Sequence, residues 1–159
     1  MRIYLRPLYV TDIERIYNIK SNPFTYNKEF TCHDTTKVSI HQVQTWFNNF
    51  INETNTIRLG ICVHDTHALI GLITLGNVDY VNSACEIHIA IDYEYQGKGY
   101  GEESMTLLLE YTSRIVRIKN ISLNVHKDNI VAVSLYEKIG FEKCDSNGYF
   151  LKYIYNVKP

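Results

Sequence analysis

The sequence lacks the features that mark secreted, membrane-spanning or nucleic-acid-binding proteins. Its four cysteines are scattered and form no CxxC pair, so we expect reduced thiols rather than a disulfide framework. No apolar run approaches the roughly 20 residues that a transmembrane helix needs, and no apolar leader segment follows Met1. The formal net charge is −1, from 16 basic and 17 acidic residues, which gives no basic excess for a nucleic acid. We therefore expect a cytoplasmic protein that binds neither membrane nor nucleic acid.

Length and composition indicate one globular domain. The chain has 159 residues, of which 45% are apolar and 21% charged, as is usual for a globular protein. We find no internal repeat, low-complexity tract or linker that would divide it. We therefore expect a single domain over residues 1–159.

The hydrophobic pattern predicts a mixed α/β fold, with a central, mostly antiparallel sheet of about seven strands and about four helices. The element order is β-α-α-β-β-β-α-β-α-β-β. Capping boxes of Thr11 with Glu14 and of Ser39 with Gln42 mark the first two helices. The strands are expected near residues 2–7, 57–63, 69–75, 84–91, 121–126, 141–144 and 149–156, and the later helices near 101–117 and 129–138.

The stretch YQGKGYGEES, residues 95–104, has glycine at alternate positions between a predicted strand and a long helix. Glycine permits backbone conformations and close approaches that side chains forbid. The first N–H groups of a helix lack partners within it and lie at its positive end. The stretch therefore predicts a phosphate-binding loop, to which Lys98 can add a charge.

Two widespread phosphate-binding motifs do not fit this loop. A Walker A loop needs Ser or Thr after its lysine, but Gly99 follows Lys98. The Rossmann fingerprint needs a third glycine at the position of Glu102. Both mismatches disfavour a nucleotide-binding switch.

The loop resembles a signature of the GNAT superfamily of N-acetyltransferases, Q/R-x-x-G-x-G/A. Downstream, NVHKDNIVAVSLYEKIGFEK resembles that superfamily's N-x-x-A-x-x-L-Y-x-K-x-G-F segment. The opening IYLRPLYVTDIERI is similar to the branch that contains ribosomal-protein and spermidine acetyltransferases. With the element order, the resemblance covers nearly the whole chain.

The resemblance implies a GNAT-like fold with acetyl-CoA as co-substrate and no metal. In this superfamily the loop holds the pyrophosphate, and the preceding strand pairs with pantetheine through its backbone. The helix expected near residues 129–138 contacts the pantetheine as well. The residues that this implies for cofactor binding are Ile89, Ala90, Ile91, Gln96, Gly97, Lys98, Gly99, Tyr100, Gly101, Glu102, Asn129, Ala132 and Lys138.

The resemblance also implies direct attack of a neutral amine on the thioester in a ternary complex. Asn129, Ala132 and Tyr136 have the spacing of one helix face, which directs Tyr136 at the thioester sulfur. An alkyl thiol has a pKa near 8.5 and a phenol near 10, so Tyr136 can protonate or hydrogen-bond the departing thiolate. The alternative is a core tyrosine with a satisfied hydroxyl.

The amine must lose a proton before it attacks. Glu86, His88 and Ala90 share one face of the predicted strand, so the carboxylate and the imidazole form a candidate base or water relay. Either side chain could instead hydrogen-bond within the sheet. The segment 64–67, HDTH, has metal-ligand residue types but favours a solvated hairpin turn.

The acceptor stays open at this point: an amino sugar, a polyamine, another small amine or a protein N-terminus. The aromatic segment with Phe24, Tyr26, Glu29 and Phe30 is expected to shape its site. We expect a monomer or a homodimer. The alternative to an enzyme is a CoA-binding regulatory or interaction module that catalyses nothing.

Overall fold

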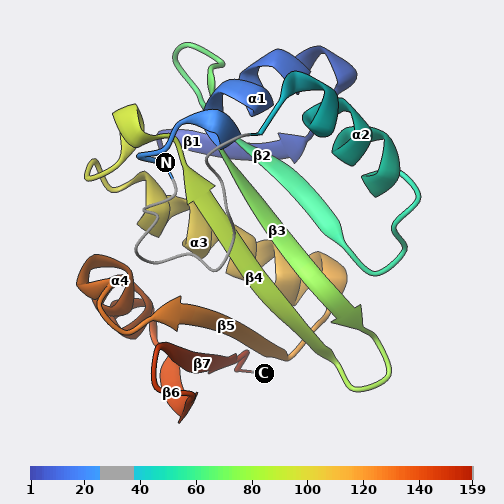
Figure 1. Cartoon of the computed structure of the whole chain (residues 1–159). Helices are drawn as coiled ribbons and strands as arrows, with labels where there is room; N and C mark the ends of the chain where they lie inside the picture. The colour runs from blue at the N-terminus through green and yellow to red at the C-terminus, as the bar shows by residue number, and fades with distance from the viewer. Residues whose placement is uncertain (26–37, 159) are drawn as a thin grey trace.

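The structure, a computed structural model, describes residues 1–25 and 38–158. A seven-stranded sheet in the order β1-β2-β3-β4-β5-β7-β6 forms its centre (Figure 1). The predicted element order is confirmed. The strands are β1 (Ile3–Pro7), β2 (Ile57–Val63), β3 (Leu69–Asp79), β4 (Ala84–Ile91), β5 (Asn120–His126), β6 (Glu142–Ser146) and β7 (Phe150–Asn156). The helices are α1 (Ile13–Ser21), α2 (Ile40–Phe50), α3 (Tyr100–Tyr111) and α4 (Ile130–Ile139).

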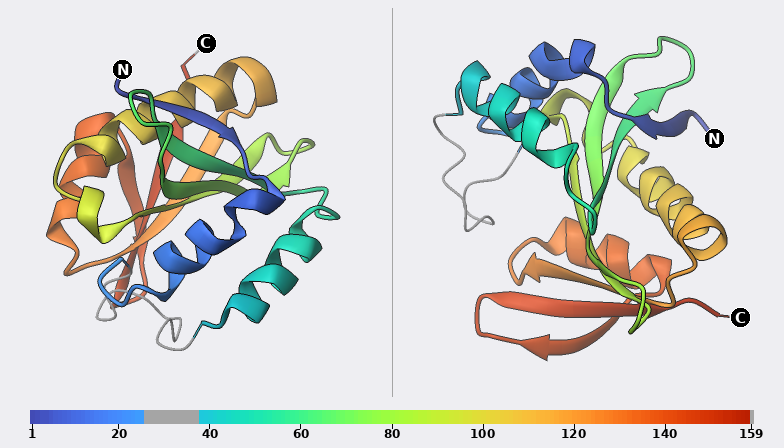
Figure 2. Two further views of the ribbon diagram at one scale, coloured as in Figure 1. Left: turned by 90° about the horizontal axis from the view of Figure 1, so that it is seen from above. Right: turned by 90° about the vertical axis from the view of Figure 1, so that its right-hand side faces the viewer.

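All neighbouring strands are antiparallel except β4 and β5. These two run parallel, and their register covers only residues 84–86 against 120–122. Beyond this point β4 and β5 diverge, so that β5, β7 and β6 turn away from the other strands (Figures 1 and 2). We call the divergence of β4 and β5 beyond Glu86 and Ser122 the β4–β5 fork.

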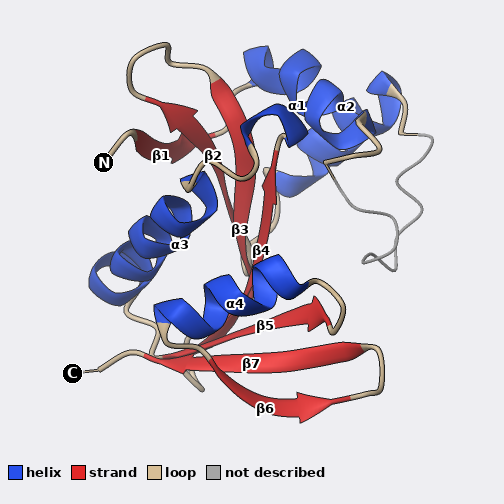
Figure 3. Ribbon diagram, turned by 90° about the vertical axis from the view of Figure 1, so that its left-hand side faces the viewer, coloured by secondary structure: helices blue, strands red, loops and turns tan. Residues whose placement is uncertain are grey.

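The helices cover both faces of the sheet, with α1 and α2 on one side and α3 and α4 on the other (Figure 3). Side chains alternate between the faces of a strand, so β1, β2 and β3 contribute to two apolar clusters, whereas β4, β5 and β7 contribute to one. The cluster on the α3 and α4 side includes Ile61, Ile73, Ile87, Met105, Leu108 and Tyr136. The cluster on the α1 and α2 side includes Ile16, Ile19, Val43, Phe47, Cys62 and Leu72.

The predicted capping box at the start of α2 is confirmed. The Ser39 Oγ accepts from the Gln42 N–H at 3.1 Å, and the Gln42 Oε1 accepts from the Ser39 N–H at 2.8 Å. The two bonds satisfy backbone donors that the first turn of a helix leaves without partners.

The prediction of a Thr11–Glu14 capping box at α1 is wrong. A 3₁₀ turn over residues 10–12 precedes α1, and the Asp12 carboxylate accepts from the Tyr9 N–H at 2.7 Å. Asp12 also pairs with Arg6 of β1 at 2.8 Å, which holds the pKa of the Asp12 carboxyl below its usual value. Asp12 is thus the N-cap residue of α1 by position, but its carboxylate bonds to Arg6 and Tyr9 and makes no capping hydrogen bond to the helix. Among the described residues, no helix has the length and apolar character required to cross a membrane.

Candidate active site at the β4–β5 fork

The backbone of β4 presents polar groups to the fork beyond its short pairing with β5. The Asp92 N–H donates to the Ile70 carbonyl of β3 at 2.8 Å. Backbone directions alternate along a strand, so Ala90 also faces β3, whereas Ile89 and Ile91 face the fork. Of the three predicted backbone contacts to pantetheine, the geometry therefore favours those of Ile89 and Ile91 and disfavours that of Ala90.

The glycine-rich loop joins the end of β4 to α3 in the conformation that its glycines allow. Gly97 has φ +70°, and Gly99, the N-cap of α3, has φ +85°. Side chains strongly disfavour this left-handed region, which explains glycine at both positions. Among the described residues, nothing near position 101 requires glycine there, because a Cβ would make only an ordinary van der Waals contact with Leu135 of α4 at 3.5 Å. The loop thus directs the positive N-terminal end of α3 toward an approaching anion.

Arg2 fastens this loop, although no motif in the sequence points to it. Its Nη2 donates to the Lys98 carbonyl at 2.8 Å, and its Nε donates to Glu103 at 2.6 Å. Its guanidinium also lies 4.6 Å from the centre of the Tyr100 ring. Residue spacing could not reveal this role, because the Arg2–Lys98 contact joins positions 96 apart.

Two predicted loop residues use their side chains within the protein. The Gln96 Nε2 donates to the carbonyls of Ile91 at 2.8 Å and Thr25 at 3.1 Å, so it ties the loop to the end of β4. The Lys98 Nζ donates to the Glu94 carbonyl at 2.8 Å. Gln96 therefore shapes the loop, while the Lys98 ammonium adds positive charge to the loop itself.

Glu102 and Lys138 are brought together by the structure. Their side chains form an ion pair at 2.8 Å that links the first turn of α3 to the last turn of α4. Both groups are exposed, and they line an outer groove together with Leu109 and Tyr155. This placement gives the two residues a role in docking the helices.

The predicted helix of Asn129 and Tyr136 begins one residue later than expected. Asn129 is the N-cap of α4 rather than a residue within it, and its Oδ1 accepts from the Ala132 N–H at 3.3 Å. A capping side chain competes with helical geometry at its own position, which displaces the start. The Asn129 amide nitrogen remains as a donor beside the half-buried Ala132.

Tyr136 lies in the α3 and α4 cluster with 9% of its surface exposed. Burial raises the pKa of its hydroxyl to about 12. Its ring packs against Phe141, with 6.0 Å between the ring centres. Within the part of the chain that the structure describes, the hydroxyl has no hydrogen-bond partner, an uncommon condition for a buried polar group.

Glu86 and His88 share the α1 and α2 face of β4, opposite to the face of Tyr136. The Glu86 carboxylate accepts from the Asn124 Nδ2 at 2.9 Å and from the Asn77 Nδ2 at 3.2 Å. The His88 Nε2 lies 3.7 Å from Glu86 Oε1, and 62% of the His88 side chain is exposed. The candidate bases and the candidate acid therefore lie on opposite faces of the sheet, with the fork between them.

The other sequence features take simpler positions. Residues 64–67 form the turn between β2 and β3, as predicted, and the Tyr4 hydroxyl lies 3.1 Å from His67 Nδ1. Among residues 1–25 and 38–158, no group of His, Cys, Asp and Glu could hold a metal ion. Phe24 is exposed beside the Tyr93 ring. Tyr26, Glu29 and Phe30 lie outside the described residues.

The family model of the acetyltransferase (GNAT) domain matches residues 2–142. A spermidine N(1)-acetyltransferase of Vibrio cholerae is 29% identical over 140 residues, which cover 88% of this chain and 79% of the relative. A crystal structure of the V. cholerae spermidine N-acetyltransferase with CoA and spermine is similar at a TM-score of 0.87 and 25% identity, covering 98% of this chain and 95% of the other. A dodecameric structure of that protein is similar at a TM-score of 0.79 and 25% identity, with coverage of 98% and 94%.

The split sheet with its glycine-rich loop defines the class as an acyl transferase that takes a CoA thioester as donor. The chain belongs to the GNAT acetyltransferase family. It is an N-acetyltransferase that uses acetyl-CoA, so the resemblance noted in the sequence is confirmed.

Replacement of Gly99 tests the role of the loop. In Gly99→Ala, the added Cβ strains a left-handed residue and would lie 3.1 Å from the Arg2 Nη2 that fastens the loop, so we expect the Kd for CoA to rise about tenfold, or about 1.4 kcal/mol. Isothermal titration with CoA measures the change.

Gly148→Ala is the matched control. Gly148 has φ +93° in the turn between β6 and β7, and its added Cβ would meet no atom within 4 Å. The two variants share the backbone strain, and only Gly99→Ala should lose CoA affinity. Equal CoA affinities in the two folded variants would contradict a phosphate-binding role for the loop.

Proposed function

We propose that the enzyme transfers the acetyl group to a primary amine by direct attack at the β4–β5 fork. The arrangement of candidate groups on opposite faces of the sheet carries this proposal. The thioester lies in the fork, and the amine approaches from the side of Glu86 and His88. The departing sulfur lies on the side of Tyr136, so that the nucleophile and the leaving group do not compete for one space.

The backbone of β4 holds the acyl chain in this proposal. The N–H groups of Ile89 and Ile91 face the fork, and a fixed N–H donor can stabilise the oxyanion of the tetrahedral intermediate. The loop and the N-terminal end of α3 hold the pyrophosphate. Asn129 offers its amide N–H to the pantetheine, and the small Ala132 lets that chain lie against α4.

Tyr136 stabilises the sulfur as negative charge develops on it. Because burial raises the pKa of Tyr136 to about 12, its hydroxyl stays protonated at neutral pH and can donate a hydrogen bond. A thiol has a pKa near 8.5, so a full proton transfer from this phenol to the thiolate is unfavourable. A strong hydrogen bond to the developing thiolate is therefore the role that we assign to Tyr136, and solvent supplies the proton later.

Glu86 receives the proton of the incoming amine, directly or through water, with His88 beside it. Asn77 and Asn124 donate to both oxygens of the carboxylate and fix its orientation at the fork. The acceptor is a small-molecule or peptide amine, and the similarity to spermidine acetyltransferases favours a polyamine. The V. cholerae relative has a dodecameric structure. We therefore add a higher oligomer to the two oligomeric states, monomer and homodimer, that the sequence led us to expect.

A thiol-release assay with acetyl-CoA and a panel of primary amines tests the proposed function. Wild-type protein should release CoA only with an amine present. Tyr136→Phe keeps the ring but removes the hydroxyl, so we expect kcat to fall about 10²-fold, the lower end of acid–base effects. The wild-type rate should not fall near pH 10, the ordinary pKa of tyrosine, because the pKa of Tyr136 is about 12.

The CoA affinity and melting temperature of Tyr136→Phe serve as its controls. Both should stay near wild type, because the hydroxyl has no protein partner among the described residues. A variant that turns over at the wild-type rate would make Tyr136 a core aromatic residue. Wild-type protein that binds CoA but releases none with any amine would instead fit a catalytically silent module.

Glu86→Gln distinguishes a base from a structural group. The amide keeps the shape but cannot accept a proton, so we expect kcat/KM at pH 7 to fall by about 10²-fold. At higher pH more of the amine is already neutral, so the variant should recover toward wild type. If the ratio of variant to wild-type kcat/KM is the same from neutral to alkaline pH, the role of Glu86 is to hold Asn77 and Asn124 at the fork.

A further inference from the structure

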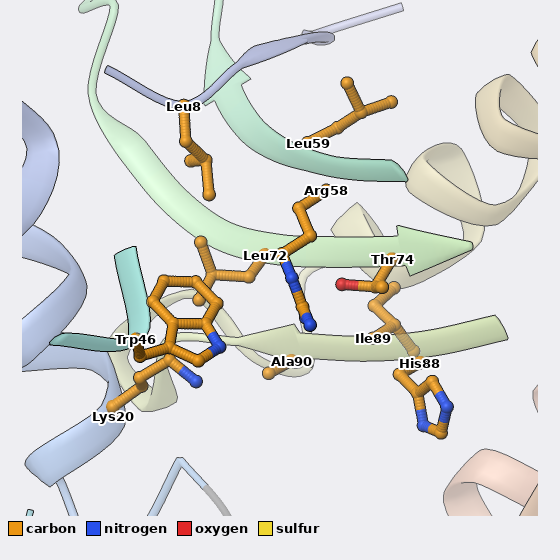
Figure 4. Close-up of a pocket in the computed structure, with 10 residues that line it drawn as sticks. All are labelled: Leu8, Lys20, Trp46, Arg58, Leu59, Leu72, Thr74, His88, Ile89 and Ala90. Atoms are coloured by element: carbon orange, nitrogen blue, oxygen red, sulfur yellow. The ribbon is translucent and has the colours of Figure 1, made fainter. Parts of the chain in front are cut away.

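A pocket of about 140 Å³ lies on the α1 and α2 face of the sheet, beside the fork. Ala90 and His88 of β4 line it, so it adjoins the strand that we propose to hold the thioester. Figure 4 shows Lys20 and Trp46 on one side of Ala90 and His88 on the other. An amine that attacks from this face would place its remaining atoms in this pocket.

Lys20 of α1 brings a positive charge to this pocket without an anionic partner. Its Nζ lies 4.3 Å from the centre of the Trp46 ring. No carboxylate in the described part of the chain forms an ion pair with it. Burial, and secondarily the charge of Arg58, lower the pKa of Lys20 to about 8. Removing an ammonium from water without a counter-ion is costly, and a bound anion would repay that cost.

Arg58 of β2 adds a second cation to the same pocket. Its guanidinium extends toward Ala90 (Figure 4) and pairs with Glu53 at 3.0 Å. Within residues 1–25 and 38–158, a polycationic acceptor in this pocket would therefore meet two cations, Lys20 and Arg58, of which only Arg58 is paired with a carboxylate. An acceptor with a negative group would meet favourable charge.

The order of charges across the face separates an amine end from an anion end. Arg58, Thr74 and His88 stand in one row across β2, β3 and β4. Glu86 lies two positions from His88 along β4 and on the same face, with 3.7 Å between Glu86 Oε1 and His88 Nε2. The Glu86 carboxylate thus lies at the end where the amine reacts. Lys20 and the Arg58 guanidinium line the pocket on the Ala90 side of His88 (Figure 4).

We infer that the acceptor is a primary amine that also carries an anionic group, a carboxylate or a phosphate, and that Lys20 binds this group. Trp46 packs on the apolar atoms between the two charged ends. The inference rests on the proposed acetyl transfer. It departs from the polyamine that the relatives favour, because Lys20 and Arg58 line this pocket, and it narrows the acceptor to a dipolar amine.

Matched acceptors test the inference on the wild-type enzyme. The carboxylate panel compares 4-aminobutanoate with its neutral amide, 4-aminobutanamide, and with the dication butane-1,4-diamine; glycine, 3-aminopropanoate and 6-aminohexanoate vary the spacing. The phosphate pair is 2-aminoethyl phosphate and 2-aminoethanol, and spermidine represents the polyamines. We expect the best anionic amine to exceed its neutral partner about tenfold in kcat/KM, a free-energy difference of about 1.4 kcal/mol.

Lys20→Met removes the charge and keeps the length of the side chain. In this variant the preference for the anionic amine should disappear, chiefly through a higher KM for that amine, while the Kd for CoA stays near wild type. Lys143→Met is the control, because it removes one positive charge from exposed β6. The control should keep the wild-type preference. Lys20→Gln provides a second uncharged variant if Lys20→Met folds poorly.

Three results would overturn the inference. They are a wild-type preference for butane-1,4-diamine or spermidine, equal activity on the anionic and neutral partners, and an unchanged preference in Lys20→Met. In each case amines are still acetylated, so the proposed function survives. Absence of CoA release with every amine would contradict the proposed function and the inference together.

Discussion

The site depends on the parallel pairing of β4 with β5 ending after three residue pairs, Ala84–Asn120 to Glu86–Ser122. A longer ladder would use the backbone groups of Ile89 and Ile91 within the protein and leave no opening in the sheet. A shorter ladder would separate β1–β4 from β5, β7 and β6, although both parts of the sheet contribute to the apolar cluster on the α3 and α4 side. The fork therefore gives a ligand access to a strand edge inside the fold, where extended chains can add backbone hydrogen bonds.

Contacts from distant parts of the chain hold the loop at the mouth of the fork. Arg2 holds the loop from β1, and Gln96 holds it against the end of β4. Asp92, buried at the start of the loop, pairs with Arg15 of α1, which also donates to the Leu69 carbonyl at 2.8 Å. These contacts order a loop whose glycines would otherwise sample many conformations. Because the loop is already ordered, it loses little conformational entropy when an anion binds at the α3 N-terminus.

Local patterns in the sequence predicted most of the fold. The alternation in ACEIHIAI and the apolar runs around it gave the strands, because these signals lie within a few residues. The start of α1 could not be predicted this way, because Asp12 stands at the N-cap and its carboxylate bonds to Arg6 of β1 rather than to the helix. The start of α4 differed by one residue, because Asn129 suits both a helix and its cap.

The site was predicted only where a motif carried it. The loop and Tyr136 were proposed from family motifs, and the alternation of β4 placed Glu86 and His88 on a common face. Arg2 and Lys20 were missed, because each is a single basic residue whose contacts come from elements distant in the sequence. Only the packing of α1 and α2 on the sheet shows that Lys20 faces a pocket beside β4.

Amide hydrogen exchange along β4, measured by NMR with and without CoA, tests most directly whether the fork holds the acyl donor. If pantetheine pairs with the exposed edge of β4, CoA should slow exchange at Ile89 and Ile91, whose N–H groups face the fork. Exchange at Ala90 should change little, because its N–H faces β3. Exchange rates at Ile89 and Ile91 that stay the same with CoA bound would contradict this account and place the donor elsewhere.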